Sequence, residues 1–149
     1  PVLADPRGLP VIVAAMRGEL AEAGVTEVDA VAGIEARGFV LGAPLAVDLG
    51  VAFVPVRKQG KLPGDVLAQT YDLEYGTATL EIQADAIARD RRVVIVDDVL
   101  ATGGTARATV DLVRSTGAEV AAVVCLLELP ALAGRDALGD VAVVTLRSL

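Results

Sequence analysis

The chain has 149 residues, a net charge of −7 at pH 7 and no histidine. A chain of this length buries one hydrophobic core, so we expect residues 1–149 to form a single domain. The negative charge disfavours nucleic acid as a partner, the lack of histidine excludes the usual metal centres and catalytic triads, and no apolar run reaches the ~18 residues of a membrane span.

Apolar residues follow helix-like and strand-like spacing in turn along the chain. The spacing predicts helices at Leu9–Ala23, Phe39–Leu49 and Thr105–Ser115, each closed by a glycine. Residues 59–75 carry glycine and proline without a clear period, which predicts a long loop or hairpin arm. This order predicts an α/β fold, a doubly wound and mostly parallel sheet flanked by helices. The predicted strands are Val28–Ala32, Val51–Val56, Thr77–Gln83, Val93–Val96, Val120–Leu127 and Val141–Leu146.

Ligands of such sheets bind where the parallel strands end, and one strand is followed there by Asp97 and Asp98. We expect both carboxylates to be exposed and to accept hydrogen bonds from ribose hydroxyls. The small, hydroxylated turn that follows favours a phosphate, because glycines admit a close ligand and helix-start N–H groups attract anions. An Asp-Asp pair alone would be read as a solvated turn, but the whole segment predicts a phosphoribosyl site. Its phosphate-binding residues are Ala101, Thr102, Gly103, Gly104 and Thr105.

Two further motifs suggest anion sites at the same edge of the sheet. Arg37 lies between two glycines after one predicted strand, as a compact oxyanion-binding turn requires. Arg57, Lys58 and Lys61 follow the next strand. Each motif alone would be read as solvated surface charge. In an acidic chain, however, cations gathered at strand ends are the residues available to an anionic ligand. The Lys of the Walker A motif is missing, which excludes a P-loop ATPase.

The segment Val93–Thr105 resembles the 5-phosphoribosyl-1-pyrophosphate (PRPP) signature of the type I phosphoribosyltransferases. The blocks Arg57–Gly64, Leu73–Gly76 and Leu80–Ile82 narrow this resemblance to the adenine phosphoribosyltransferases, over nearly the whole chain. The resemblance implies the type I phosphoribosyltransferase fold with residues 59–75 as a flexible hood. It also implies purine salvage, in which adenine and PRPP give AMP and pyrophosphate. Mg²⁺ would be the cofactor, held mainly by PRPP and water, and the protein would be a homodimer.

By the same resemblance, individual residues receive roles. Glu74 in the hood is expected to serve proton transfer, with Tyr75 lining the closed site. Val99 is expected to support the base, and a cis peptide is expected near Glu35–Ala36. Arg57 is expected to reach the neighbouring subunit's site. The pyrophosphate-binding residues would be Glu35, Ala36, Arg37, Lys58, Lys61 and Arg57.

The family's segment that covers adenine precedes the position of Pro1, so we expect this segment and the extreme C-terminus to be missing. Base choice is therefore open, and a phosphoribosyltransferase for another purine is the first alternative. A non-catalytic, PRPP-sensing regulator of the same fold is the second. The N-terminal residues lack the basic and apolar regions of a signal peptide, which favours a cytoplasmic protein.

Overall fold

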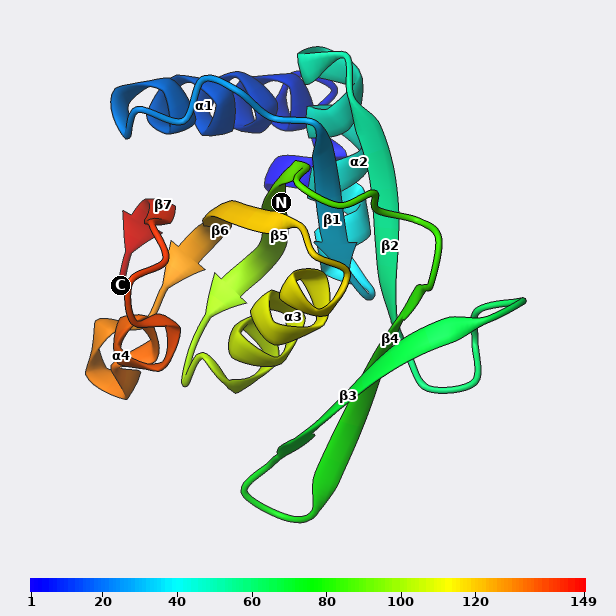
Figure 1. Cartoon of the computed structure of the whole chain (residues 1–149). Coiled ribbons are helices and arrows are strands. Elements are labelled where there is room, and N and C mark those ends of the chain that lie inside the picture. The colour runs from blue at the N-terminus through cyan, green and yellow to red at the C-terminus, as the bar shows by residue number, and fades with distance from the viewer.

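The computed structural model describes all 149 residues, and a seven-stranded sheet forms its centre. Five neighbouring strands run parallel, and two at one edge are antiparallel. The expected mostly parallel α/β sheet is confirmed. The helices are α1 (Gly8–Glu22), α2 (Arg37–Leu49), α3 (Gly104–Ser115) and α4 (Gly134–Leu138), with 3-10 turns at Val2–Ala4 and Pro130–Leu132. The strands are β1 (Ala30–Ile34), β2 (Ala52–Lys58), β3 (Val66–Asp72), β4 (Thr77–Gln83), β5 (Arg92–Leu100), β6 (Glu119–Glu128) and β7 (Val143–Ser148), in the spatial order β3-β4-β2-β1-β5-β6-β7 (Figure 1).

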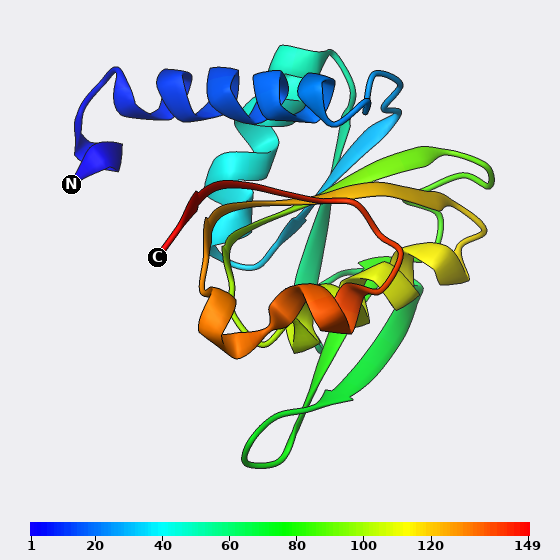
Figure 2. The same cartoon turned by 90° about the vertical axis from the view of Figure 1, so that its left-hand side faces the viewer.

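Helices cover both faces of the sheet, as a doubly wound fold requires. Figure 2 shows α1 and α2 on one side of the strands and α3 and α4 on the other. The alternation along β5 explains this arrangement. Val93 and Ile95 pack into the cluster that contains α3, whereas Val94 and Val96 pack into the cluster that contains α1 and α2. Burial of each such side chain contributes about 1.5–3 kcal/mol. The two-sided core therefore fixes the strand that carries the Asp pair.

The predicted helices agree with the structure to within two residues, but several strands differ. β1 and β7 each lie two residues later than expected, at Ala30–Ile34 and Val143–Ser148, and β2 continues two residues further, to Lys58. β5 continues to Leu100, so Asp97 and Asp98 lie within the strand instead of beyond its end. The reason is its neighbour β6, which pairs with β5 as far as Leu100. The helix α4 was not predicted, because five residues are too few to establish a helical period.

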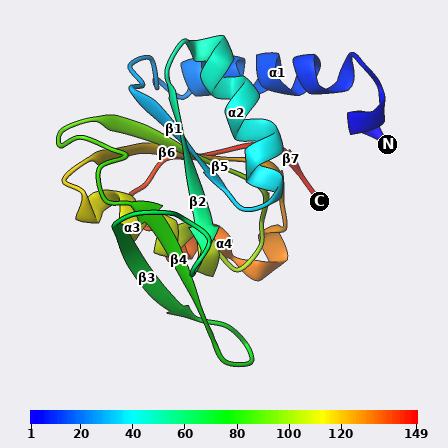
Figure 3. The same cartoon turned by 90° about the vertical axis from the view of Figure 1, so that its right-hand side faces the viewer.

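The segment at 59–75 forms part of a β-hairpin that extends from one edge of the sheet (Figure 3). β3 and β4 pair along their full lengths, from Val66 with Gln83 to Asp72 with Thr77. At the turn, the N–H of Leu73 donates to the carbonyl of Gly76 over 2.9 Å. Of the predicted alternatives, the hairpin arm is therefore the observed one. None of the helices has the length and apolar character needed to cross a bilayer.

Candidate active site

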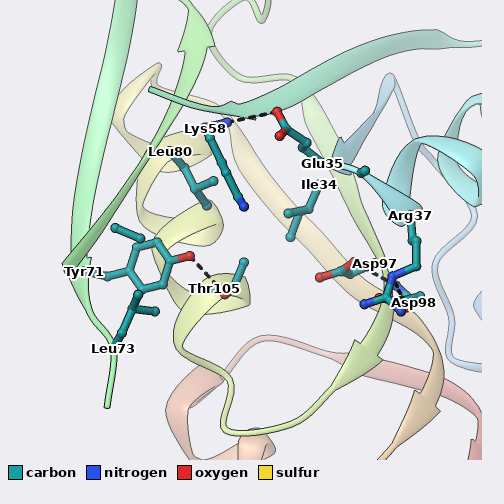
Figure 4. A pocket seen from close by; sticks show the side chains of 12 residues that line it. Ile34, Glu35, Arg37, Lys58, Tyr71, Leu73, Leu80, Asp97, Asp98 and Thr105 are labelled. Carbon is teal, nitrogen blue, oxygen red and sulfur yellow. Dashed lines mark hydrogen bonds and ion pairs between the residues drawn. The ribbon is translucent and has the colours of Figure 1, made fainter. Parts of the chain in front are cut away.

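A cleft of about 330 Å³ opens at the edge of the sheet where the parallel strands end (Figure 4). Its walls come from the β1–α2 turn, the end of β2, the β3–β4 hairpin, the start of α3 and β5. Ligand sites of open α/β sheets lie in this position. The lining residues are Ile34, Glu35, Ala36, Arg37, Lys58, Tyr71, Leu73, Ala78, Leu80, Asp97, Asp98 and Thr105.

The β1–α2 turn packs directly against the backbone of β5. A Cβ atom on Gly38 would lie 2.6 Å from the carbonyl oxygen of Val96, so only glycine fits there. The peptide bond between Glu35 and Ala36 is cis, as expected from the family resemblance. This close approach brings Arg37 beside the Asp pair. Its Nε atom lies 2.9 Å from Oδ2 of Asp98.

The Asp pair is less exposed than the sequence suggested. The Asp98 side chain is 18% exposed, and Asp97 is half-buried, because both residues belong to a paired strand. The expectation of two exposed carboxylates was therefore wrong. The N–H of Asp98 donates to Oδ1 of Asp97 over 2.8 Å. Burial raises the pKa of Asp97 to about 7, and the neighbouring charge of Asp98 also raises it, against the lowering effect of that hydrogen bond.

The Glu35 carboxylate holds the basic segment 57–61 in place. Nε of Arg57 lies 3.3 Å from Oε1 of Glu35, the N–H of Lys58 donates to the same oxygen over 3.2 Å, and Nζ of Lys61 pairs with Oε2. Burial favours a neutral carboxyl here, but the bonds from Lys61, Lys58 and Arg57 hold the pKa of Glu35 below its ordinary value. Glu35 was predicted to bind pyrophosphate. Its carboxylate is committed to these cations, so the pyrophosphate role of Glu35 stays a prediction.

The turn between β5 and α3 forms a second, smaller cleft of about 90 Å³. Gly103 caps the helix in the left-handed region, with a φ of 85° that favours glycine. All five residues predicted to bind phosphate line this cleft, and so do Asp97 and Val99. The structure therefore places the predicted ribose and phosphate residues side by side. The smaller cleft shares Asp97 and Thr105 with the larger one.

Tyr71 is a cleft residue that the sequence motifs did not reveal. Its hydroxyl lies 3.1 Å from Oγ1 of Thr105, so the hairpin touches the phosphate turn (Figure 4). Residues 66–71 show no clear period in the sequence, so no local pattern indicated which side chains of this strand face the cleft.

Four predicted site residues lie outside the lining of both clefts. Glu74 and Tyr75 occupy the tip of the hairpin, where Tyr75 is 93% exposed. Arg57 and Lys61 are turned toward Glu35. The catalytic roles of Glu74 and Tyr75, and the pyrophosphate roles of the two cations, thus stay predictions. Among the described residues, no three His, Cys, Asp or Glu side chains gather as a metal cluster.

Comparisons with known proteins give this geometry a family. Residues 6–147 match the model of the phosphoribosyl transferase domain. The chain is 56% identical over 147 residues to an adenine phosphoribosyltransferase from a Nocardioides species, covering 98% of this chain and 80% of that relative. The solved adenine phosphoribosyltransferase of Thermoanaerobacter pseudethanolicus superposes with a TM-score of 0.95 at 46% identity, covering 100% of this chain and 85% of that one.

A third comparison concerns an enzyme solved with ligands. The Saccharomyces cerevisiae adenine phosphoribosyltransferase, in complex with an imino-altritol bisphosphate and adenine, superposes with a TM-score of 0.93 at 42% identity. The match covers 97% of this chain and 82% of the yeast chain. Fold and site together thus define a type I phosphoribosyltransferase. Within that class, the chain belongs to the adenine phosphoribosyltransferase family.

Proposed function

We propose that this chain transfers the 5-phosphoribosyl group of PRPP to adenine, giving AMP and pyrophosphate, and so serves purine salvage. One observation carries the proposal. The Asp97–Asp98 pair lies between two turns suited to anions, the Arg37 turn and the turn at 101–105. A sugar diol flanked by a diphosphate and a phosphate fits this order. Adenine as the base follows from the relatives, which are named for it.

In this reaction, the bond from ribose C1′ to a pyrophosphate oxygen breaks and a bond to adenine N9 forms. Positive charge develops on the ribose, negative charge develops on pyrophosphate, and the N9 proton leaves. Arg37 and Lys58 line the cleft and are suited to stabilise the departing anion. When Arg37 turns toward pyrophosphate, the Asp98 carboxylate becomes free to accept a hydrogen bond from a ribose hydroxyl.

The donors in the cleft are compatible with Mg²⁺ bound together with PRPP. Mg²⁺ keeps several water ligands and binds through one or two carboxylates plus substrate phosphates. Asp97 and Asp98 are the carboxylates that would face it, through water, while PRPP supplies most of its other ligands. When bound, the ion neutralises charge on the diphosphate.

The remaining assignments concern the hairpin, the base and the assembly. Closure of the hairpin would bring Glu74 to the N9 proton and Tyr75 to the wall of the closed site, with Val99 beneath the base. We also propose a cytoplasmic homodimer in which Arg57 serves the partner's site. Within one chain Arg57 pairs with Glu35, so this role requires Arg57 to leave that carboxylate.

A pyrophosphate-release assay tests the proposal. The full chain is incubated with PRPP and Mg²⁺, and adenine, hypoxanthine, guanine or xanthine is added in turn. We expect release with adenine far above that with the other bases. Preference for another base would make the chain a different purine phosphoribosyltransferase. Calorimetric binding of PRPP without release on any base would instead identify a PRPP-sensing regulator.

A further inference from the structure

The phosphate turn at 101–105 rests on the backbone of α4. A Cβ atom on Gly103 would lie 2.5 Å from the carbonyl oxygen of Gly134, the first residue of α4. A Cβ atom on Gly134 would overlap the carbonyl oxygen of Ala101. Figure 1 shows α4 beside the chain that leaves β5 for α3. Because neither contact leaves room for a side chain, the shape of the turn depends on where α4 lies.

An ion pair between the nearly buried Glu128 and the half-exposed Arg135 holds α4 in place, together with the buried side chain of Leu138. This helix has five residues, too few to be stable by its own backbone bonds. Arg135 binds Glu128 at the end of β6 in a bidentate manner, with Nε 2.7 Å from Oε1 and Nη2 2.8 Å from Oε2. The Arg135 Nη1 also donates to the carbonyl of Val143 over 3.1 Å, and the Thr145 hydroxyl donates to Oε2 of Glu128 over 3.1 Å. These bonds tie α4 to β6 and β7.

The Glu128–Arg135 pair supports the turn at 101–105 from behind, without lining the clefts where a ligand would bind. The Glu128 side chain is 8% exposed, so removal of Arg135, which is itself 48% exposed, would leave a nearly buried carboxylate without its partner, at a cost in free energy. The hydrogen bond from Arg135 holds the pKa of Glu128 below its ordinary value, against the opposing effect of burial. Neither residue lines the larger or the smaller cleft. The pair can therefore act on a ligand only indirectly, through α4 and its contact with the turn or through the pairing of Glu128 with Leu100, which precedes the turn.

We infer that Glu128 and Arg135 are positioning residues for the 5′-phosphate subsite, which they shape by holding Gly134 against the turn. This inference rests on the proposed function, because it takes the turn at 101–105 as the seat of a sugar phosphate. It deepens that function by separating two anion sites. The phosphate turn depends on this pair, whereas the Arg37 turn does not contact it.

Binding of two separate fragments of PRPP tests the inference. Ribose 5-phosphate and inorganic pyrophosphate, both with Mg²⁺, are titrated by calorimetry into the wild type, Glu128→Gln and Arg135→Gln. We expect the Kd of ribose 5-phosphate to rise about 10- to 100-fold, the range known for outer-shell partners of metal ligands. The Kd of pyrophosphate should stay within about twofold, because neither residue of the pair lines the larger cleft that contains the Arg37 turn. Arg135→Lys, which keeps the charge but loses the bidentate geometry, should recover part of the affinity.

Glu119→Gln is the matched control. Glu119 is the first residue of β6 and Glu128 is the last. Glu119 pairs with Arg92 over 3.1 Å, at the end of the strands that lies away from the clefts. It should leave both affinities unchanged. Gly134→Ala removes no charge but alters the contact, so it tests the inference even where a charge variant fails to fold. Equal loss of both ligands, or unchanged ribose 5-phosphate binding in Gly134→Ala, would overturn the inference. If the wild type binds neither fragment, the proposed function itself fails.

Discussion

Nε of Arg37 lies 2.9 Å from Oδ2 of Asp98. A residue predicted to bind pyrophosphate and a residue predicted to bind ribose therefore neutralise each other's charge. Arg37 is 79% exposed, and an ion pair with so exposed a partner contributes only about 0–1 kcal/mol. A diphosphate can therefore attract Arg37 at little cost. Under the proposed function, the departure of Arg37 would make the Asp98 carboxylate available to the ribose in the same event.

Replacement of the two carboxylates should weaken PRPP binding without unfolding the protein. We expect Asp97→Asn and Asp98→Asn each to cost ~1.5–3 kcal/mol of PRPP binding, the value of a hydrogen bond to a charged group. Calorimetry with PRPP measures this loss, and circular dichroism checks the fold. Asp48→Asn, at a carboxylate paired with Arg17 on a helix outside the cleft, is the control. Wild-type affinity in a folded Asp97→Asn/Asp98→Asn double variant would remove both residues from the site.

The raised pKa of Asp97 predicts a pH dependence of stability. Between pH ~4 and ~7 the folded protein holds a proton that the unfolded chain has lost, so the free energy of unfolding falls as pH rises through this window. In Asp97→Asn the side chain cannot ionise, so this contribution to the fall of the free energy of unfolding with pH should disappear. Urea unfolding at pH 5 and pH 8 is the measurement. Asp97→Asn should gain stability relative to the wild type at the higher pH, and parallel pH profiles would contradict the prediction.

The hairpin tip should affect turnover more than substrate binding. If Glu74 takes the N9 proton in the transition state, Glu74→Gln lowers kcat well beyond any change in the KM for PRPP. Steady-state kinetics measure both constants. Asp72→Asn, an exposed carboxylate of the same hairpin, serves as the control. An unchanged kcat in Glu74→Gln would end the proton-transfer assignment, and equal loss in kcat and kcat/KM without a change in KM would support it.

Mixed dimers test whether Arg57 acts across a subunit interface. Inactive Arg57→Ala subunits are combined with inactive Asp97→Asn/Asp98→Asn subunits. If Arg57 serves the partner, each mixed dimer has one site with both defects and one with neither, so activity should partly return. Differently tagged subunits verify that the dimers are mixed. No recovery in verified mixed dimers, or a monomer at assay concentration, would assign Arg57 to its own subunit, where Glu35 holds it.

Replacement of two glycines by alanine should change the stability of the protein in opposite directions. Gly38→Ala places a Cβ atom 2.6 Å from the Val96 carbonyl oxygen and should cost about 1–3 kcal/mol, the usual penalty of overpacking. Gly18→Ala lies in α1 with no neighbour within 4 Å and should stabilise the protein by about 0.5–1 kcal/mol, because alanine is the better helix former. Denaturant unfolding measures both. Equal stability of the two variants would contradict the packing argument.

Features that depend on local sequence pattern could be predicted, whereas features that depend on contacts between separate elements could not. Period and glycine stops located the main helices, and the segment 93–105 predicted the ribose and phosphate residues that β5 and its turn bring together. The true end of β5 was not predictable, because it depends on pairing with β6. The contact of Tyr71 with Thr105 spans 34 positions, and no local pattern encodes it. The commitment of Glu35 to Arg57 and Lys61 likewise joins separate elements.

The β3–β4 hairpin is attached to the rest of the sheet through the cation-bearing end of β2. β4 is attached to β2 through the pairs Arg57–Glu81 and Lys58–Leu80, and the N–H of Gly60 donates to Oε2 of Glu81 over 3.0 Å. The pairing that attaches the hairpin thus includes residues that carry cations. A swing of the hairpin about this attachment would also shift these cations. Closure of the hairpin over the cleft and arrangement of positive charge would then be one coupled movement.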